Sequence, residues 1–185
     1  MGRCCRCLVV PRVLRCRRCV LPFLAVAAVA SALWWQHHRA PPSPPENLAE
    51  GTYPLQRVID GDTLLLANGA RIRLIGANAP ETVQRDHAIE PWGAEARQFT
   101  AEFVSGGLIR LQFDRERLDK YRRFLAYVWV EDRMLNEELI RAGLARAELG
   151  FRFSESMKTR FRRAEQEAKD AGRGIWSQVP AGPAP

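Results

Sequence analysis

The chain has 185 residues, of which 46% are hydrophobic and 26% are charged; this is typical of one globular domain with additional end segments. Its net charge of +7 suggests a nucleic-acid partner, but seven of the 28 basic residues lie in the first fifty positions, against two acidic ones. The rest of the chain, with 21 basic and 19 acidic residues, carries only +2. The total charge therefore indicates little about the folded part, and a nucleic-acid surface must be argued from local clusters.

Residues 1–19 form a basic segment that contains all five cysteines: Cys4, Cys5, Cys7, Cys16 and Cys19. Two C-x2-C spacings match zinc-ligand pairs, but the stretch between them is short and arginine-rich. This favours a reduced, basic tail that faces the cytosol over a zinc knuckle. The later domain has no cysteine, which excludes disulfides and thiol chemistry there.

Residues 20–35 are apolar and uncharged, which predicts either a signal peptide or a short transmembrane anchor. The Ala-Ser-Ala sequence at 30–32 suits a cleavage site, whereas the two tryptophans at 34 and 35 suit a bilayer interface and favour the anchor. Both alternatives leave the N-terminus in the cytoplasm. The domain is then membrane-anchored on the outer, periplasmic side, or secreted. Residues 36–50 are proline-rich and predict a stiff linker.

Residues 51–177 carry the periodic patterns of a folded domain, and the proline- and glycine-containing tail 178–185 is expected to be disordered. Hydrophobic periodicity and turn signals predict strands over 55–59, 63–67, 71–75, 108–114 and 124–130, and helices over 91–104, 134–143 and 156–171. Five short strands with an inserted helix suit a small closed barrel. The predicted fold class is therefore α+β, a five-stranded OB-fold-like β-barrel with about three helices.

Three short stretches contain candidate functional residues. In "IDGDT", Asp60 and Asp62 project to one face of an extended chain, although D-G-D is also common turn chemistry. In "RLIGANAPE", Arg73 lies on the polar face of a strand and Glu81 follows a proline that fixes the backbone. In "DKYRRFLAY", Tyr121 lies among cations, a combination that can grip phosphate oxygens or simply form a solvated loop.

Together, five stretches resemble the thermonuclease (staphylococcal nuclease-like) family. These are "VIDGDT", "RLIGANAPE", "DKYRRFLAY", "NEELIRAGLA" and "AEQEAKDAGRGIW", in this order, and the resemblance covers about Tyr53 to Ser177. It implies an OB-like barrel and a calcium-dependent phosphodiesterase that acts on DNA and RNA and leaves 3′-phosphate ends.

The resemblance also implies a calcium site. Asp62 matches the family's first calcium carboxylate, Asn78 stands where the family has its second, and Ala79 would supply a backbone carbonyl. Asp60 would support the ion through water, and Glu81 matches the carboxylate proposed as general base. Calcium prefers oxygen ligands, and all of these residues supply oxygen. Since Asn78 removes one negative charge, weaker calcium binding is expected.

The phosphate contacts follow from the same resemblance. Arg73 and Arg123 match the two arginines that clamp the phosphate, Tyr121 matches a phosphate-contacting tyrosine, and Lys120 beside it is taken as substrate-binding. The chain departs from the family at two further places. Arg122 replaces a glycine, and Leu149 and Phe151 stand where the family places two tyrosines, so that Phe151 can stack on a base without donating a hydrogen bond.

A non-catalytic nucleic-acid- or protein-binding module on the same barrel is the alternative. It would use the loop at 121–123 and a basic helix face of Lys158, Arg162 and Arg163, although that face is equally explained by solvation. The partners expected are DNA and/or RNA, and a membrane through the N-terminal segment. The chain is expected to be monomeric.

Overall fold

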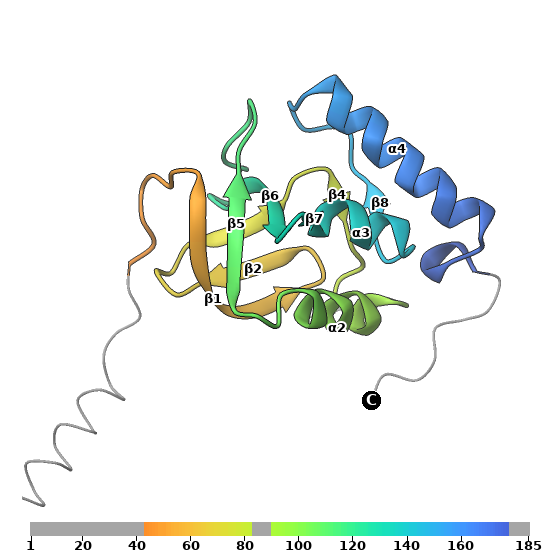
Figure 1. Cartoon of the computed structure of the whole chain (residues 1–185), viewed down its shortest axis with the longest axis horizontal. Helices are drawn as coiled ribbons and strands as arrows, with labels where there is room; N and C mark the ends of the chain where they lie inside the picture. Colours follow the sequence, from red (N-terminus) through yellow and green to blue (C-terminus); the bar gives the residue numbers. More distant parts are fainter. Residues whose placement is uncertain (1–42, 83–89, 178–185) are drawn as a thin grey trace, which may run out of the picture. The chain divides into compact units, whose positions relative to one another are not determined.

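The computed structural model describes residues 43–82 and 90–177 (Figure 1). The predictions for the tail 1–19, the segment 20–35, the first part of the linker (36–42) and residues 178–185 lie outside the described residues. A membrane-spanning helix would need a long apolar stretch, and none of the helices in the two described ranges has one.

Five strands close into a barrel, as predicted. They are β1 (Gly51–Asp60), β2 (Thr63–Leu66), β3 (Arg71–Leu74), β5 (Leu108–Gln112) and β6 (Phe124–Val130). Antiparallel pairing gives the order β3-β2-β1-β5-β6, and a parallel pairing between β3 and β6 closes the sheet on itself. The α+β, OB-fold-like barrel is thereby confirmed.

Strand β1 is longer than its predicted core at 55–59, because it serves both sides of the barrel. Its first half, Gly51–Pro54, pairs with β5, and its second half, from Leu55, pairs with β2. The register with β2 shifts twice, which is the signature of bulges that bend a strand at a barrel corner. Such a bend leaves no simple alternation in the sequence.

Three two-residue strands complete the sheets. β4 (Ala77–Asn78) pairs with β8 (Arg146–Ala147), and β7 (Arg133–Met134) forms a hairpin with the end of β6. None of the three was predicted, since two residues carry no periodicity. The β4–β8 pair matters for the site because it holds the stretch after β3 in place.

The three predicted helices are confirmed as α2 (Gly93–Phe103), α3 (Leu135–Arg141) and α4 (Glu155–Asp170), and a 3-10 helix, η1 (Gly174–Trp176), follows. Helix α2 packs on β1, and α3 lies between β6 and α4 (Figure 1). The buried residues of α4 are Phe161, Ala164 and Ala168, at the spacing of one helix face.

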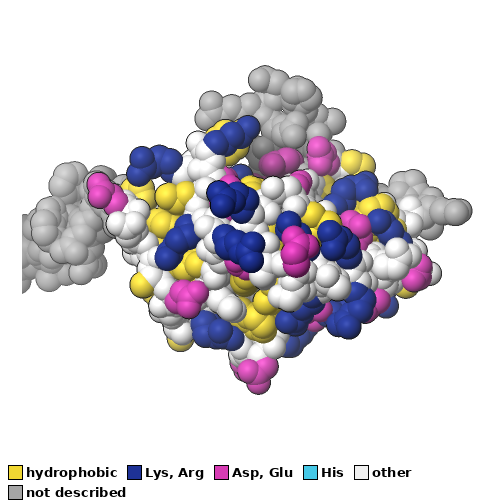
Figure 2. Space-filling model, turned by 90° about the horizontal axis from the view of Figure 1, so that it is seen from above, with side chains coloured by type: hydrophobic (Ala, Val, Ile, Leu, Met, Phe, Trp, Pro, Cys, Tyr) yellow, Lys and Arg dark blue, Asp and Glu magenta, His cyan; other side chains and the backbone are white. Residues whose placement is uncertain are grey.

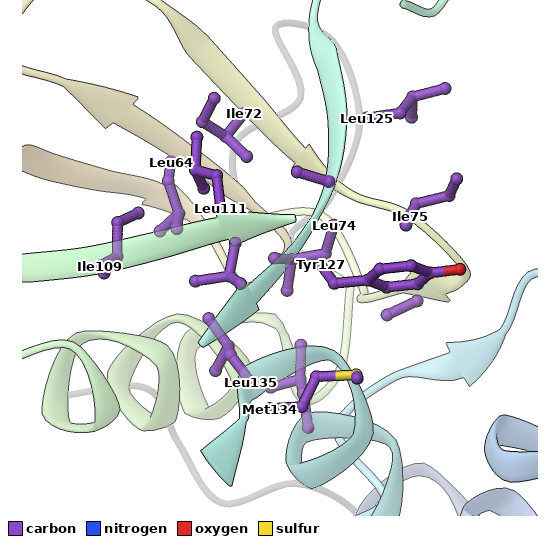
Figure 3. Packing of buried hydrophobic residues seen from close by; sticks show 14 of the residues in the cluster. Leu64, Ile72, Leu74, Ile75, Ile109, Leu111, Leu125, Tyr127, Met134 and Leu135 are labelled. Atoms are coloured by element: carbon purple, nitrogen blue, oxygen red, sulfur yellow. The ribbon is translucent and has the colours of Figure 1, made fainter. Parts of the chain in front are cut away.

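Aliphatic side chains from β2, β3, β5 and β6 fill the core, together with residues of α3 (Figure 3), and partly buried side chains of β1 pack against it. Tyr127, Phe153 and Phe161 form an aromatic group with ring centroids about 6 Å apart, which joins β6 to α4. Leu48, which the sequence places in the linker, is only 5% exposed and belongs to the core. Packing therefore begins before Gly51.

A buried amide fixes the chain just after β3. Asn136 of α3 donates from Nδ2 to the carbonyl oxygens of Ile75 and Ala126, at 2.9 and 3.1 Å, and its Oδ1 accepts from the Val128 amide at 2.9 Å. These bonds tie α3 to β6 and to the first residue after β3. The stretch that contains Asn78 and Glu81 thus starts from a rigid point.

Candidate functional site

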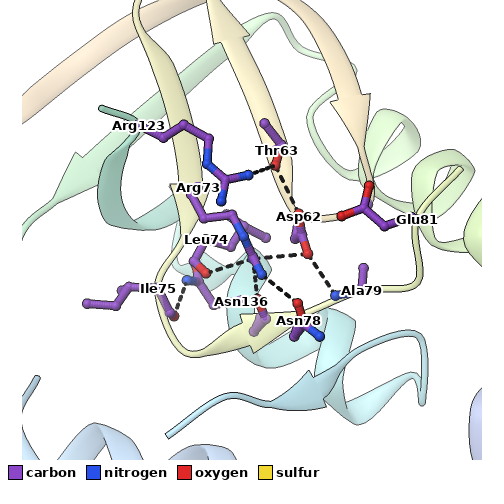
Figure 4. Close-up of polar contacts among 12 residues, drawn as sticks. Asp62, Thr63, Arg73, Leu74, Ile75, Asn78, Ala79, Glu81, Arg123 and Asn136 are labelled. Carbon is purple, nitrogen blue, oxygen red and sulfur yellow. Dashed lines mark hydrogen bonds and ion pairs between the residues drawn. The ribbon is translucent and has the colours of Figure 1, made fainter. Parts of the chain in front are cut away.

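An ion pair between Asp62 and Arg73 forms the centre of the site (Figure 4). Arg73 Nη1 lies 3.0 Å from Asp62 Oδ2, and Arg73 is only 6% and Asp62 only 5% exposed. Arg73 pairs in register with Thr63 across β2 and β3, which brings its side chain beside Asp62. The sequence placed Arg73 on the polar face of the barrel. The structure shows instead that the stretch after β3 folds back over its guanidinium.

Arg73 is held in one orientation by the backbone that follows it. Nη1 donates to the carbonyl oxygens of Leu74 and Ala77, and Nη2 donates to Asn78 Oδ1 at 2.7 Å. A guanidinium has five N–H donors. Nε–H and one hydrogen of Nη2 have no acceptor in the part of the chain that the structure describes, so Arg73 is fixed and still has donors to offer a ligand.

Asp62 connects the remaining parts of the site. Its Oδ2 accepts from the Ala79 amide at 2.8 Å, and its Oδ1 accepts from the Thr63 hydroxyl at 2.9 Å. Thr63 Oγ1 in turn accepts from Arg123 Nη1 at 3.5 Å. Burial raises the pKa of Asp62 above its ordinary value, against Arg73 and the Ala79 amide, which lower it. The positive charges and hydrogen bonds around Asp62 thus offset only part of the cost of burying its negative charge.

Arg123 is supported by a carboxylate that the sequence analysis missed. Asp119 Oδ1 accepts from the backbone amides of Tyr121 and Arg123 at 2.8 and 2.9 Å, and its Oδ2 accepts from Arg123 Nε at 2.6 Å. Burial acts to raise the pKa of Asp119, but the Arg123 amide and guanidinium hold it below its ordinary value. An aspartate at the start of a turn that bonds amides further on is a recognisable sequence signal.

Tyr121 and Lys120 lie on this same loop. Tyr121 is 67% exposed, and the centroid of its ring lies 4.9 Å from Lys120 Nζ and 5.4 Å from Arg123 Cζ. An exposed ring between two cations can meet a phosphate or a base. Arg122, also exposed, has a φ of +61°, a backbone conformation that favours glycine.

Glu81 lies on the other side of Asp62, and Figure 4 shows its carboxylate directed toward Asp62. Burial, and then the charges of Asp60 and Asp62, raise the pKa of Glu81 above its ordinary value, while Arg73 opposes them. Glu90, which the sequence analysis also missed, forms hydrogen bonds with both the backbone amide and the backbone carbonyl of Glu81. Its carboxylate accepts from the Glu81 amide at 3.2 Å, and its own amide donates to the Glu81 carbonyl at 3.3 Å.

Helix α2 packs tightly behind the acidic turn. A Cβ on Gly61 would lie 2.7 Å from the Cβ of Ala96 and 2.8 Å from that of Ala79, so only glycine fits between the helix and the loop. The Thr100 hydroxyl donates to the Gly61 carbonyl at 2.6 Å. Asp60, beside this turn, accepts from the Thr82 hydroxyl. The geometry of the turn is therefore set by close packing.

The structure thus joins most of the predicted site residues into one group. Asp62, Arg73, Asn78 and Ala79 are linked by direct bonds, Arg123 joins through Thr63, and Asp60 and Glu81 are coupled electrostatically. Lys120 and Tyr121 lie on the same loop as Arg123, and the Tyr121 ring contacts both cations. Phe151 is different, because it is half-buried against the core and no described contact ties it to this group.

Oxygen donors are the groups that could hold a cation here. They are the Asp62 carboxylate, the Asn78 amide oxygen and the Ala79 carbonyl, with Asp60 beside them. Across residues 43–82 and 90–177, no group of three or more His, Cys, Asp or Glu side chains is arranged to hold a metal by itself. A cation would therefore need neutral oxygens as well as carboxylates, which is the mixture that calcium accepts.

Comparison with known proteins decides the family. The family model described as staphylococcal nuclease homologue matches residues 71–178, more than half of the chain. The chain belongs to the staphylococcal nuclease family. Within this family it is similar to the thermonuclease of Staphylococcus hyicus, with 38% identity over 134 residues that cover 71% of this chain and 79% of the relative.

Two further relatives agree with this assignment. The thermonuclease of Staphylococcus intermedius is 38% identical over 130 residues, covering 69% of this chain and 77% of the relative. Endonuclease YncB of Bacillus subtilis is 38% identical over 128 residues, covering 67% of this chain and 61% of the relative. The resemblance inferred from the five sequence motifs is confirmed, and the barrel belongs to the staphylococcal nuclease family.

Proposed function

We propose that this protein is a calcium-dependent nuclease that hydrolyses phosphodiester bonds of DNA and/or RNA. The relatives' names, thermonuclease and endonuclease, support the reaction class. The observation that carries the proposal is the chain of contacts from Arg73 through Asp62 and Thr63 to Arg123. It brings two guanidiniums to one carboxylate, with a second carboxylate, Glu81, facing the same point (Figure 4).

The donor set fits calcium. Asp62 and Asn78 both bond to the guanidinium of Arg73, so their oxygens lie within reach of one ion. The Ala79 carbonyl, and Asp60 through a water molecule, would complete the protein's share of ligands. All of these are hard oxygen donors, and the incompletely compensated charge of buried Asp62 favours a cation beside it. When bound, calcium would neutralise charge on the phosphate.

The chain's own residues perform the remaining steps. Hydrolysis adds negative charge to a phosphoryl group that is already anionic, and Arg73 and Arg123 stabilise that charge with donors that are fixed before the substrate arrives. Glu81 removes the proton from the attacking water. A raised pKa suits this role, because a base works best when its pKa approaches the working pH.

Substrate contacts beyond the phosphate are proposed for Lys120, Tyr121 and Phe151. Tyr121 and Lys120 lie on the loop that carries Arg123, and Tyr121 is largely exposed. Phe151 offers a ring that could stack on a base. These contacts would hold the nucleotides next to the phosphate that is cut.

The second candidate function is a non-catalytic binding module on the same barrel. The hydrogen bond from Arg73 Nη2 to Asn78 Oδ1, 2.7 Å, favours the binding module. The amide oxygen of Asn78 already accepts from an arginine, and Asn78 carries no negative charge that would attract a metal ion. Such a module would retain DNA without cutting it. One experiment separates the two functions.

The test is cleavage of single-stranded DNA by the purified protein, with calcium or with a chelator. The nuclease proposal predicts cleavage that requires calcium and that falls by about 10²–10⁴-fold in Glu81→Gln, with most of it lost in Arg123→Ala as well. Glu102→Gln and Arg97→Ala are matched controls, since both residues are exposed on α2 and take part in none of the hydrogen bonds or ion pairs described for the site. Retention of DNA without any cleavage would establish the binding module instead.

We also propose that the domain works outside the cytoplasm as a monomer, either anchored through residues 20–35 or released by cleavage after Ala32. Mass spectrometry of the mature N-terminus distinguishes an anchored protein from a cleaved one. Size-exclusion chromatography with light scattering tests the monomer.

A further inference from the structure

The charge of the folded domain is strongly uneven. We call residues 114–123 and 146–163 together the basic rim. The basic rim holds eleven basic and five acidic residues, a net charge of +6, whereas the rest of 51–177 holds ten basic and fourteen acidic residues, a net charge of −4. The small net charge of the domain therefore hides a marked separation of sign.

The two segments of the basic rim form one surface, because they bond to each other. The Arg152 amide donates to Glu116 Oε2 at 2.7 Å, and the Glu116 amide donates to the Arg152 carbonyl at 3.0 Å. The Ser154 amide donates to Asp114 Oδ2 at 3.0 Å. These bonds also direct the carboxylates of Asp114 and Glu116 toward backbone amides, so neither pairs with an arginine side chain of the rim.

Several cations of the basic rim are consequently left for a partner. Arg115, Lys120, Arg122, Arg152 and Arg162 are exposed and form no ion pair within the described residues. Figure 2, which views the molecule from the side where α4 and the β5–β6 loop lie in Figure 1, shows Lys and Arg side chains spread over this face.

Glu155 shows that cations from both segments lie close together. Lys158 first, and then Arg162 and Arg115, hold the pKa of this exposed carboxylate below its ordinary value. Two of these cations belong to α4 and the third to the loop after β5. The loop and the helix thus present their charges at one place, next to the Arg152 backbone that joins them.

Exposed apolar groups interleave with these charges. Tyr121 is 67% exposed and Leu118 is 40% exposed, on the same loop as Arg123. Phe151, half-buried, is the neighbour of Arg152 in the chain. Cations that follow a phosphate backbone, alternating with rings on which bases can stack, are the recurring pattern of single-stranded nucleic-acid binding. Bases in a duplex are already stacked and cannot use such rings.

We propose that the basic rim is the track for a single-stranded polynucleotide on one side of the phosphate that Arg73 and Arg123 hold. Arg122, next to the clamp, contacts the first flanking phosphate, and Arg152, Arg115 and Arg162 contact phosphates further away. This inference rests on the proposed function for the position of the cut, but the binding it describes needs no cleavage. It makes the preferred substrate an unpaired strand several nucleotides long.

The test is fluorescence anisotropy of a labelled single strand of about 12 nucleotides, a length within the usual range of such sites. The full chain is titrated in chelator, which prevents cleavage, over a series of salt concentrations. The double variant R152A/R162A is compared with R57A/R97A. The second variant removes two arginines that lie outside the basic rim, are exposed and form no ion pair within the described residues. Circular dichroism and thermal unfolding confirm that both variants fold.

Each phosphate contact to a single strand contributes about 0.7 to the slope of log K against log salt. R152A/R162A should therefore reduce the magnitude of this slope by about 1.4 and weaken binding, while R57A/R97A leaves the slope and the affinity unchanged. Equal changes in the two variants, or no change in either, overturn the proposal. A duplex of the same sequence should bind more weakly than the single strand, and equal or tighter duplex binding overturns the single-strand assignment.

Failure of this inference is distinct from failure of the proposed function. The anisotropy comparison depends only on binding, and cleavage by the parental protein in calcium is measured separately. A protein that cuts DNA but shows no special role for Arg152 and Arg162 keeps the proposed function and loses the track. A protein that binds through the rim but never cuts keeps the track alone.

Discussion

Arg122 is expected to strain the loop that carries the phosphate clamp. Its φ of +61° lies in the left-handed region, which costs a non-glycine residue about 1–2 kcal/mol. Glycine avoids this cost but loses about 0.5–1 kcal/mol more conformational entropy on folding. Because the strain is the larger of the two, Arg122→Gly should raise the free energy of unfolding by about 0.5–1 kcal/mol, or Tm by about 2–5 °C.

The assay compares Arg122→Gly with Arg122→Ala in urea and thermal unfolding. Both variants remove the guanidinium, but only glycine relieves the backbone, so a gain in stability confined to glycine reports strain. Glu131→Gly is the matched control, since exposed Glu131 has a φ of +54° in the turn between β6 and β7, in another part of the barrel. It should gain a similar amount.

The loop should keep its shape in both Arg122 variants. The bond from the Arg122 amide to the Asp119 carbonyl, 3.0 Å, is made by the backbone, and Asp119 continues to hold Arg123. Any loss of DNA binding common to glycine and alanine then reports the missing charge. A glycine variant less stable than the alanine variant would refute the reasoning.

Three more changes test other parts of the site and fold. Asn78→Asp adds the missing negative charge and should lower the half-saturating calcium concentration several-fold in calorimetry; an unchanged or higher requirement counts against Asn78 as a ligand. Glu137 is buried; burial acts to raise its pKa, but Arg160 and Arg141 lower it below 4.5. Glu137 therefore contributes stability that is present above pH 4.5 and is lost as the pH falls through its lowered pKa. Glu137→Gln should thus cost about 1–3 kcal/mol at pH 7 and flatten the acid limb of the unfolding curve, and a limb of parental steepness would contradict this. Glu90→Ala should lower kcat about 10–100-fold at unchanged KM by releasing Glu81, whereas Glu90→Gln keeps the acceptor and the rate; equal losses would exclude a positioning role.

Much of the barrel could be predicted because its five strands and three helices are each marked by a local pattern of apolar residues and turn signals. What the sequence could not show arises from long-range contacts. The bend of β1 appears only when its halves pair with two different strands. The β4–β8 pair joins residues almost seventy positions apart and has two residues on each side.

The candidate site could be predicted as a set of residues, because the motifs carry them in order. Their physical state could not. Arg73 has the alternation of a surface residue, yet it is buried because the chain returns over it through Ala77 and Asn78. Thr63 and Asp119 act by holding other residues. The position of Asp119 at the start of its turn is a signal that could have been recognised, whereas no local pattern marks Thr63 for its role.

A double-mutant cycle with Arg73→Lys and Arg123→Lys tests most directly whether both guanidiniums act on one phosphate. For each variant, kcat/KM on single-stranded DNA and the free energy of unfolding are measured in parallel. If both act on one phosphate, the two losses of activity should be coupled by more than about 0.5 kcal/mol, with a smaller coupling in stability. Losses of activity that add within about 0.3 kcal/mol would show that the two arginines act on separate groups.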